Sequence, residues 1–467
     1  MKTSPSLSYS LIAASALLPL ASAGMAAEKP AAAVSAGWQK PAWLTDLSAG
    51  VKESYDDNVL AVSGDGMSKQ GSSITTLAPK VGFNFAPLLG KQKTFQSLSL
   101  VYAPEFNFYQ DASSESYNAH KLASTIKGGQ GDFTFSLDNA FLYNDGSAEA
   151  PTYALNQGVA GAGQNDKNRS AYATAYARER RKQIQNRTTI VLQYDVGQFF
   201  IRPTAALLAY DFMTDLRNNS AAPYKGYQDY ADRSDVNGGL DLGYKVVKDV
   251  ALEVGYRYGH QDQSPYSSAI DSSASGWVNG KRTQSSSDYQ RILFGVEGKP
   301  LKWLTVKLAM GPEFRAYNDA APVTDDNTIN YYGEGSLTAA IDKTQTLAFT
   351  YKHWQWVSST GKIPYADNTF ALTYHWNVTK QLGLDLGAKY LYSDYTCGSA
   401  ALTSNSSLRN DAVYVASVGA SYAFTPHLSA NVAYSADLGR NQQANATAAD
   451  FRDYDRQLVS AGVNYKF

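Results

Sequence analysis

From Leu44 to its end the chain repeats one pattern, in which about ten residues alternate between apolar and polar side chains before a connection follows. Residues 250–259 alternate in this way, and so do residues 304–315 and 382–392. Successive residues of a strand point to opposite faces, so each segment predicts a strand with one apolar face. The other face carries Gly, Ser, Thr and charges of both signs in strand after strand, which suits a water-filled interior.

The connections between these segments alternate between short and long. Eight of them are short turns, at residues 86–93, 127–131, 195–198, 245–249, 298–302, 342–345, 377–380 and 424–427. The connections between them include longer, polar segments, at residues 145–182, 213–231, 262–287 and 318–327. Short turns on one side and long loops on the other are typical of outer-membrane barrels, whose short turns are periplasmic and whose long loops are external.

The number of strands follows from these turns. Eight hairpins give sixteen strands, and a first strand at residues 44–54 and a last one at residues 453–467 raise the number to eighteen. An even number returns both ends of a barrel to the periplasm. Strand boundaries predicted from sequence are good to a few residues, so sixteen strands are the alternative. We therefore predict an all-β fold, a single transmembrane antiparallel β-barrel of about eighteen strands over residues 44–467.

The first residues have the features of a secretory signal peptide. Lys2 gives a positive start, residues 7–20 are apolar or small, and Ala21-Ser22-Ala23 is an A-x-A cleavage site. The apolar run is shorter than the ~20 residues that a spanning helix needs. We therefore expect a signal peptide at residues 1–27, and an extended periplasmic lead-in, rich in Ala, Lys and Pro, at residues 28–43.

Aromatic residues gather near the ends of the predicted strands. They include Trp303, Tyr331, Tyr332, Trp354, Trp356, Trp376, Tyr422 and Phe424. Transmembrane barrels carry a girdle of aromatic side chains at each membrane interface, and we assign these residues to such girdles. The alternative is that they reflect only the high β propensity of Tyr and Trp.

Composition narrows the function classes. The 467 residues carry 41 Lys and Arg against 42 Asp and Glu, a formal net charge of −1, which argues against a nucleic-acid binder. Charged residues make up 18%, below the roughly 25% of soluble globular proteins. The single cysteine, Cys397, excludes an internal disulfide and a metal site built from clustered cysteines.

The chain shows little sign of catalytic chemistry. It has no P-loop, no dinucleotide-binding glycine motif after a strand and no G-x-S-x-G. The five histidines are scattered, and only His260, near Asp262, or His353 could be nominated for a barrel enzyme. Residues 56–58 and 325–327, both Asp-Asp-Asn, could bind Ca²⁺, but an Asx-rich turn is the favoured interpretation. We expect no enzymatic activity, no metal and no cofactor.

The last strand carries a resemblance. Residues 459, 461, 463, 465 and 467 are Val, Ala, Val, Tyr and Phe on one face, opposite Ser, Gly, Asn and Lys. A terminal Phe preceded by apolar or aromatic residues at alternate positions resembles the C-terminal signal of bacterial outer-membrane barrels. The resemblance implies that Val463, Tyr465 and Phe467 are read by the barrel assembly machinery.

The first strand carries a second resemblance. Residues 55–60 read Tyr-Asp-Asp-Asn-Val-Leu, which is similar to a Tyr-Asp-Asp-Asn-Ile motif in a family of β-barrel porins. Some members of that family accompany exopolysaccharide loci. The resemblance implies a place in the cell outer membrane and keeps a role in polysaccharide export open.

Function should lie on the polar face of the strands. Its charged residues include Lys80, Glu105, Asp138, Arg202, Asp241, Lys245, Glu253, Arg257, Arg291, Glu297, Lys307, Glu313, Arg315, Lys352, Asp385 and Lys389. We nominate Arg202, Glu253, Arg257, Arg291, Lys307, Glu313 and Arg315 as pore-lining residues. Both signs are present, which fits a general polar pore better than one selective for one ion sign. The alternative is that these residues pair across strands and only stabilise the wall.

The connection at residues 145–182, the third external loop, is the proposed place of a constriction. It ends in a group of basic residues that faces only Glu179, namely Arg178, Arg180, Arg181 and Lys182, with Arg187 in the strand that follows. Folded into the lumen, these charges would favour anions. Alternatively, the alternation of Tyr172, Thr174 and Tyr176 with Ala extends the sixth strand above the membrane, where the arginines would meet lipopolysaccharide phosphates.

Together these patterns predict an outer-membrane, porin-like channel for passive diffusion of small hydrophilic solutes. Barrels of sixteen to eighteen strands leave an aqueous channel, whereas eight-stranded ones are filled by side chains. The expected partners are outer-membrane lipid and lipopolysaccharide, the barrel assembly machinery and small solutes, with a homo-oligomer open and nucleic acid excluded. The alternatives are an exit barrel for polysaccharide export, a barrel enzyme, and a structural or adhesive surface barrel with an occluded lumen.

Overall fold

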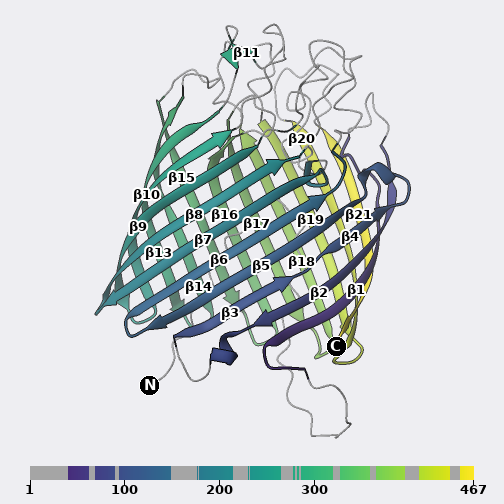
Figure 1. Cartoon of the computed structure of the whole chain (residues 1–467), viewed down its shortest axis with the longest axis horizontal. Helices are drawn as coiled ribbons and strands as arrows, with labels where there is room; N and C mark the ends of the chain where they lie inside the picture. The colour runs from purple at the N-terminus through teal and green to yellow at the C-terminus, as the bar shows by residue number, and fades with distance from the viewer. Residues whose placement is uncertain are drawn as a thin grey trace, which may run out of the picture.

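A closed antiparallel sheet forms the body of the protein (Figure 1). The computed structural model describes residues 40–62, 69–89, 94–148, 176, 178–213, 230, 232–263, 277–278, 281–282, 285–318, 327–357, 364–394, 410–441 and 453–467. The first strand, β1 (Leu44–Asp56), pairs on one side with β2 (Ser72–Asn84) and on the other with β21 (Tyr454–Lys466). The sheet therefore closes into a barrel that has no free edge.

The barrel wall contains nineteen hydrogen-bonded segments, of which β3 and β4 form one interrupted strand, so eighteen strands surround the lumen. After β1 and β2 these are β3 (Phe95–Tyr102) with β4 (Glu105–Tyr109), β5 (Tyr117–Gln130), β6 (Phe133–Asp145), β7 (Gln183–Val196), β8 (Phe199–Phe212), β9 (Arg233–Val247), β10 (Val250–Gln263), β13 (Ser287–Leu301), β14 (Leu304–Tyr317), β15 (Asn327–Ala340), β16 (Gln345–Trp356), β17 (Tyr365–Asn377), β18 (Leu382–Asp394), β19 (Asn410–Ala423), β20 (Leu428–Asn441) and β21. The prediction of eighteen strands is confirmed, and the alternative of sixteen is wrong.

Short elements lie between some of these strands. A separate hairpin of β11 (Trp277–Val278) and β12 (Lys281–Arg282) lies between β10 and β13. Two short 3₁₀ turns, η1 (Ala86–Leu89) and η2 (Ser113–Glu115), follow β2 and β4. No helix in the described ranges is long and apolar enough to cross a membrane.

The interruption of the third strand has a local cause. Pro104 separates β3 from β4, and proline has no N–H to give to a neighbouring strand. The register with β5 is unchanged across the break, since Tyr102 pairs with Leu122 and Glu105 with Ala119. The two pieces therefore hold one place in the wall.

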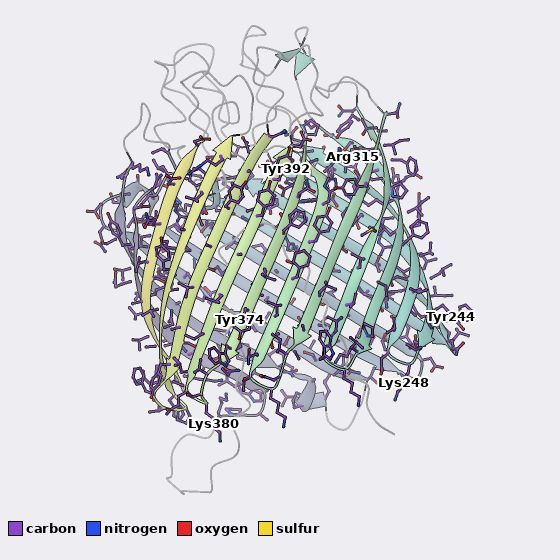
Figure 2. All side chains as sticks on the ribbon, turned by 180° about the vertical axis from the view of Figure 1, so that it is seen from behind. Tyr244, Lys248, Arg315, Tyr374, Lys380 and Tyr392 are labelled. Atoms are coloured by element: carbon purple, nitrogen blue, oxygen red, sulfur yellow. The ribbon has the colours of Figure 1, made fainter. Side chains whose placement is uncertain are left out.

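All eight short turns lie where the sequence predicts them, between β2 and β3 and then between every second pair of strands. Gly131 and Gly197 open two of the tightest turns with φ of +62° and +61°, a conformation that disfavours residues with a side chain. Figure 2 shows Lys248 and Lys380 at the lower end of the barrel, where these turns lie. The chain also ends there (Figure 1).

The outer face of the wall is apolar. On β10, Leu252 and Val254 are 53% and 50% exposed, whereas the side chain of Glu253 between them is 9% exposed. Glu253 points inward, because it shares Arg202 of β8 with Glu297 of β13, and side chains from strands this far apart converge only on the concave face. A closed barrel with paired backbone and an apolar outer face spans a lipid bilayer. The protein is thus a transmembrane barrel of the outer-membrane type.

The prediction of aromatic girdles is correct in part. Tyr331, Trp376, Tyr422 and Phe424 are exposed on the outer face, and Trp303 is exposed in the turn between β13 and β14. Figure 2 shows Tyr374 low and Tyr392 high on the same wall, as expected for belts at two membrane interfaces.

Three aromatic residues were assigned to the girdles wrongly. Tyr332 and Trp356 are 7% and 4% exposed, and their positions, like that of Trp354, point into the barrel. The physical reason is alternation, because Tyr331 faces outward and its chain neighbour must face inward. Inside, Trp356 packs with Tyr210 of β8.

Candidate functional site

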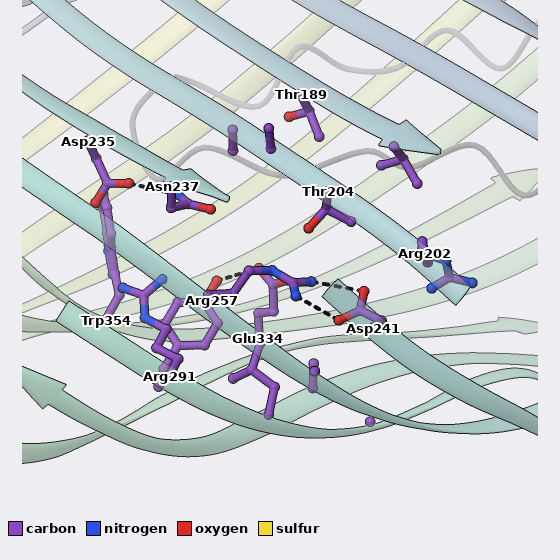
Figure 3. A pocket seen from close by; sticks show the side chains of 18 of the residues that line it. Thr189, Arg202, Thr204, Asp235, Asn237, Asp241, Arg257, Arg291, Glu334 and Trp354 are labelled. Atoms are coloured by element: carbon purple, nitrogen blue, oxygen red, sulfur yellow. Dashed lines mark hydrogen bonds and ion pairs between the residues drawn. The ribbon is translucent and has the colours of Figure 1, made fainter. Parts of the chain in front are cut away.

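The lumen holds a cavity of about 160 Å³ on the inner side of β7 to β10 and β13 to β16 (Figure 3). Its charged lining residues are Arg187, Arg202, Asp235, Asp241, Glu253, Arg257, Arg291, Lys307, Glu334 and Lys352. They come from eight strands, and alternation along each strand turns them to the inside. The cavity is therefore polar because of the same register that makes the outer face apolar.

Arg202 joins its own strand, β8, to three others of the wall, β7, β10 and β13. Its Nη1 lies 2.9 Å from Glu253 Oε2, and its guanidinium also bonds Glu297. Its Nε donates to Gln193 Oε1 at 2.9 Å, and its Cζ lies 4.4 Å from the ring centroid of Phe200. These contacts hold the guanidinium in one place on the wall.

Arg257 and Asp241 form a second, forked pair, marked by dashed lines in Figure 3. Arg257 Nη1 donates to Asp241 Oδ1 at 2.7 Å and Nη2 donates to Oδ2 at 2.9 Å. Such a two-point geometry is the strong form of an arginine–carboxylate contact. Gly255 leaves the space for it, since a Cβ there would lie 2.3 Å from Asp241 Oδ1.

Glu313 links two arginines in a third group. It accepts hydrogen bonds from Arg291 Nε at 2.6 Å and from Arg315 Nε at 2.8 Å, and it is fully buried. The Cζ of Arg291 lies 4.0 Å from the ring centroids of both Tyr289 and Tyr332. The rings add a cation–π attraction on each side of the guanidinium.

The charges around the cavity nearly balance. Six cationic residues line it, Arg187, Arg202, Arg257, Arg291, Lys307 and Lys352, and four acidic ones, Asp235, Asp241, Glu253 and Glu334. Glu297 bonds Arg202, and Glu313 bonds both Arg291 and Arg315, so the described charges in and around the lining are seven cationic and six acidic residues. Nearly equal numbers of both signs in a lumen do not favour one ion sign strongly.

The end of the third external loop lies inside the barrel. Tyr176 donates a hydrogen bond from its hydroxyl to Asp437 of β20, and Arg456 of β21 places its Cζ 4.0 Å from the Tyr176 ring. Six strands of the wall separate β7, which follows this segment, from β20. Residues 176, 178 and 179 are helical, so the chain is not an extended continuation of β7 here. Residues 172 and 174 lie outside the described residues.

Glu115 anchors this segment. Arg180 Nε lies 2.8 Å from Glu115 Oε2, and Arg181 Nη2 lies 2.5 Å from Oε1. All three side chains are buried, and Arg180 Nη2 also donates to the Val59 carbonyl at 2.9 Å. Burial alone would raise the pKa of Glu115, but Arg180 and Arg181 outweigh it and hold that pKa below its usual value. The basic group thus faces a carboxylate that the sequence analysis did not name.

The neighbouring charges of this segment lie in the same space. Arg178 is buried, and its carbonyl accepts a hydrogen bond from Gln183 Nε2 at 2.7 Å. Burial raises the pKa of Glu179, although Arg178 and Lys389 of β18 both act to lower it. The segment therefore carries charges of both signs into the lumen near the external end of the strands.

Comparison with known proteins gives no family for the chain. No family model and no curated protein matches the sequence. The chain is similar to the solved structure of Pseudomonas aeruginosa OpdK with vanillate, at 11% identity over 91% of this chain and 100% of that chain, with a TM-score of 0.42. It is also similar to the unliganded ferric citrate transporter FecA, at 11% identity over 91% of this chain and 79% of that chain, with a TM-score of 0.41. A loop L8 deletion mutant of OmpT from Vibrio cholerae is similar at 10% identity over 90% of this chain and 98% of that chain, with a TM-score of 0.34. Similarity at this level indicates nothing about the function of the chain.

The acidic motif at residues 56–58 closes the seam of the barrel. Asp56 is fully buried, and its carboxylate accepts a hydrogen bond from Arg456 Nη2 at 2.6 Å. Asn58 Nδ2 donates hydrogen bonds to the carbonyl oxygens of Val62 at 2.8 Å and Asp455 at 2.9 Å. The Asn58 N–H donates to Asp56 Oδ1 at 3.0 Å, which is an Asx turn. In the part of the chain that the structure describes, no three metal-ligating side chains gather. Residues 325 and 326 of the second motif lie outside that part.

The other nominated residues lie on the outer face. His260 Nδ1 is 2.9 Å from Asp288 Oδ1, with both side chains half exposed, and His353 Nδ1 is 2.8 Å from Asn368 Oδ1. Val463, Tyr465 and Phe467 are exposed in a row along the seam strand β21. Their reading by the assembly machinery stays a prediction, and so does the signal peptide, which lies outside the described residues.

Sequence reasoning missed several lumenal residues. Asp235 was within its reach, because it lies six residues before the predicted inward Asp241 on the same strand. Glu115 was not, since it lies 65 residues before Arg180 in a short polar connection without alternation.

Proposed function

We propose that the protein is a passive outer-membrane channel for small hydrophilic solutes. The observation that carries this proposal is the polar cavity, lined by nearly equal numbers of both charges, within an eighteen-stranded wall. Barrels of this size leave an aqueous channel rather than a core filled by side chains. Paired charges fixed on the wall offer hydrogen bonds to a passing solute without holding it tightly.

The proposed restriction of the channel is the segment at residues 176–182. It occupies the lumen near the external end of the strands and is tied to Glu115 on one side and Asp437 on the other. Because Glu115 offsets part of the charge on Arg180 and Arg181, we expect this restriction to limit solute size more than ion sign. Replacing Arg178, Arg180 and Arg181 with Ser and measuring the reversal potential separates the two effects. A shift toward cations would show an anion-favouring constriction.

The test of the proposed function is the conductance of the refolded protein in a planar bilayer. We expect stepwise currents that are proportional to voltage, as a permanently polar lumen requires. A correctly folded, heat-modifiable barrel that conducts nothing would contradict the proposal and favour a structural barrel with an occluded lumen.

An exit barrel for polysaccharide export is the weaker alternative. It rests on the resemblance of residues 55–60. Asp56 and Asn58 of that motif form hydrogen bonds that join β1 to β21. Because these contacts give the motif a structural role in the wall, the diffusion channel is the function that we propose.

A further inference from the structure

A row of polar side chains crosses the outer wall at the middle of three neighbouring strands. Ser124 of β5 pairs with Asn139 of β6, and Asn139 pairs with Thr188 of β7. Asn186, the next residue on the same face of β7, completes this polar row. Asn139 is the seventh of the thirteen residues of β6, and so lies midway along its strand.

The polar row faces outward. On β7 the residues of the same alternation, Ile190 and Leu192, are each 37% exposed, whereas Arg187 points to the cavity. On β6 the polar row is flanked by Leu137 and Phe141. Figure 1 shows β5, β6 and β7 side by side across one wall of the barrel.

The rest of the described wall differs from this region. At the middle of β8 to β21 the outward residues are aliphatic, aromatic, glycine or proline, for example Leu252 and Val254 on β10, Leu386 on β18 and Val432 on β20. Polar side chains in contact with the hydrocarbon of a bilayer are costly. Three polar side chains at mid-strand, with Asn186 beside them toward the external end of β7, therefore call for a different neighbour than lipid.

The polar row is ordered but incompletely bonded. Asn139 Nδ2 donates to Asn186 Oδ1 at 2.6 Å and to Thr188 Oγ1 at 2.8 Å. Among the described residues, neither Asn139 Oδ1 nor the Asn186 amide N–H groups have a hydrogen-bond partner. The Asn139 oxygen, midway along its strand, cannot turn to water inside a bilayer, so its partner has to come from another molecule.

We propose that the outer face of β5 to β7 docks against a second copy of this chain, with the polar row at the centre of the contact. The row is self-complementary, since it offers a free acceptor on Asn139 and free donors on Asn186. A two-fold axis along the membrane normal brings the polar rows of two copies together at the same depth in the membrane. The Asn186 amide of each copy can then donate a hydrogen bond to Asn139 Oδ1 of the other. The small side chains of Ser124 and Thr188 permit close approach of the two walls.

The test uses a thiol cross-link in intact outer membranes. Ser124→Cys is placed in a Cys397→Ser background, with Leu386→Cys, at the middle of the opposite wall, as the matched control. Treatment with a short bis-thiol reagent should convert most of the Ser124→Cys protein into a band of twice the chain mass and leave the control as a single chain. No double band, or equal yields at the two positions, would overturn the proposal.

A second set of variants separates docking from folding. Asn139→Leu, Asn186→Leu and Thr188→Val, combined with Ser124→Cys, should lower the cross-link yield at least tenfold. The heat-modifiable barrel and its conductance should stay unchanged, because these side chains face away from the lumen. A cross-link yield that survives the three substitutions would show that the polar row does not hold two copies together.

Discussion

At the scale of single residues, the charges in the lumen are fixed by their partners. Glu313 is shared by Arg291 and Arg315, and Arg291 lies between two tyrosine rings. An ion taken out of water costs several kcal/mol unless other groups bond it, and these contacts supply that bonding. The wall therefore presents charge to the lumen on side chains that cannot swing freely across it.

The facing of single residues gives a first prediction. Leu386→Arg, which places a charge on the outer face near mid-bilayer, should destabilise the barrel by about 2–4 kcal/mol. The matched control is Ala123→Arg, at the middle of β5 on the inner face, where the side chain is exposed to the lumen. Urea titrations of refolded protein in lipid measure both. Equal destabilisation by the two variants would mean that the assignment of inner and outer faces is wrong.

At the scale of elements, the segment at residues 176–182 is bonded to the barrel wall at one end and to a loop residue at the other. Glu115 fixes Arg180 and Arg181 at one end, and Asp437 accepts a hydrogen bond from Tyr176 at the other. The segment crosses from the β7 side of the wall to β20. Its position depends on a few buried contacts, so a change at one of them should change the open area of the lumen.

The pKa of Glu115 gives a second prediction. Because that pKa is lowered in the folded protein, the ionised carboxylate stabilises the anchored segment above the ordinary Glu pKa of about 4.3, and this contribution is lost as pH falls through the lowered value. Conductance should therefore rise as the pH is taken well below 4.3. Glu115→Gln should show the raised conductance already at neutral pH and lose the response to acid.

The control for this prediction is another acidic residue outside the strands. Asp342 lies in an exposed turn, where the backbone N–H of Thr344 donates to it and helps to lower its pKa. Asp342→Asn should leave both the conductance and its response to acid as in the unchanged protein. If Glu115→Gln behaves like this control, Glu115 does not hold the segment in place.

The sequence predicts the individual strands and turns but not the contacts between distant loops. The strands and their turns could be predicted because alternation and turn residues are local properties, and Gly131 and Gly197 lie where tight turns were expected. The contact between Arg180 and Glu115 could not, because it joins two loops that meet only when the barrel is closed. Tyr332 and Trp356 were misplaced for a related reason, since nearness to a strand end does not determine which face a residue occupies.

At the scale of the whole molecule, the proposed diffusion depends on the balance of charge in the lumen. The chain carries 41 basic and 42 acidic residues, and the cavity repeats that balance within a small volume. Where charges of opposite sign lie close together in a lumen, their fields largely cancel and salt screens the remainder. Neither cations nor anions are then concentrated inside. This fits a channel for many small polar solutes better than one for a single ion.

The third prediction tests this balance by removing one charge. In a salt gradient across a planar bilayer, the unchanged protein should show a reversal potential close to zero, because seven cationic and six acidic groups oppose one another in and around the described lining of the cavity. Lys307→Gln takes one cation from the cavity lining, so the reversal potential should shift toward cation preference. The matched control is Lys80→Gln, on the inner face of β2 but outside that lining, where Lys80 pairs with Asp46 at 2.8 Å. Since the Lys80 pair is partly exposed to water, salt screens it and the shift there should be smaller. Equal shifts in the two variants, or none in either, would show that the ion path does not pass along the wall formed by β7 to β16.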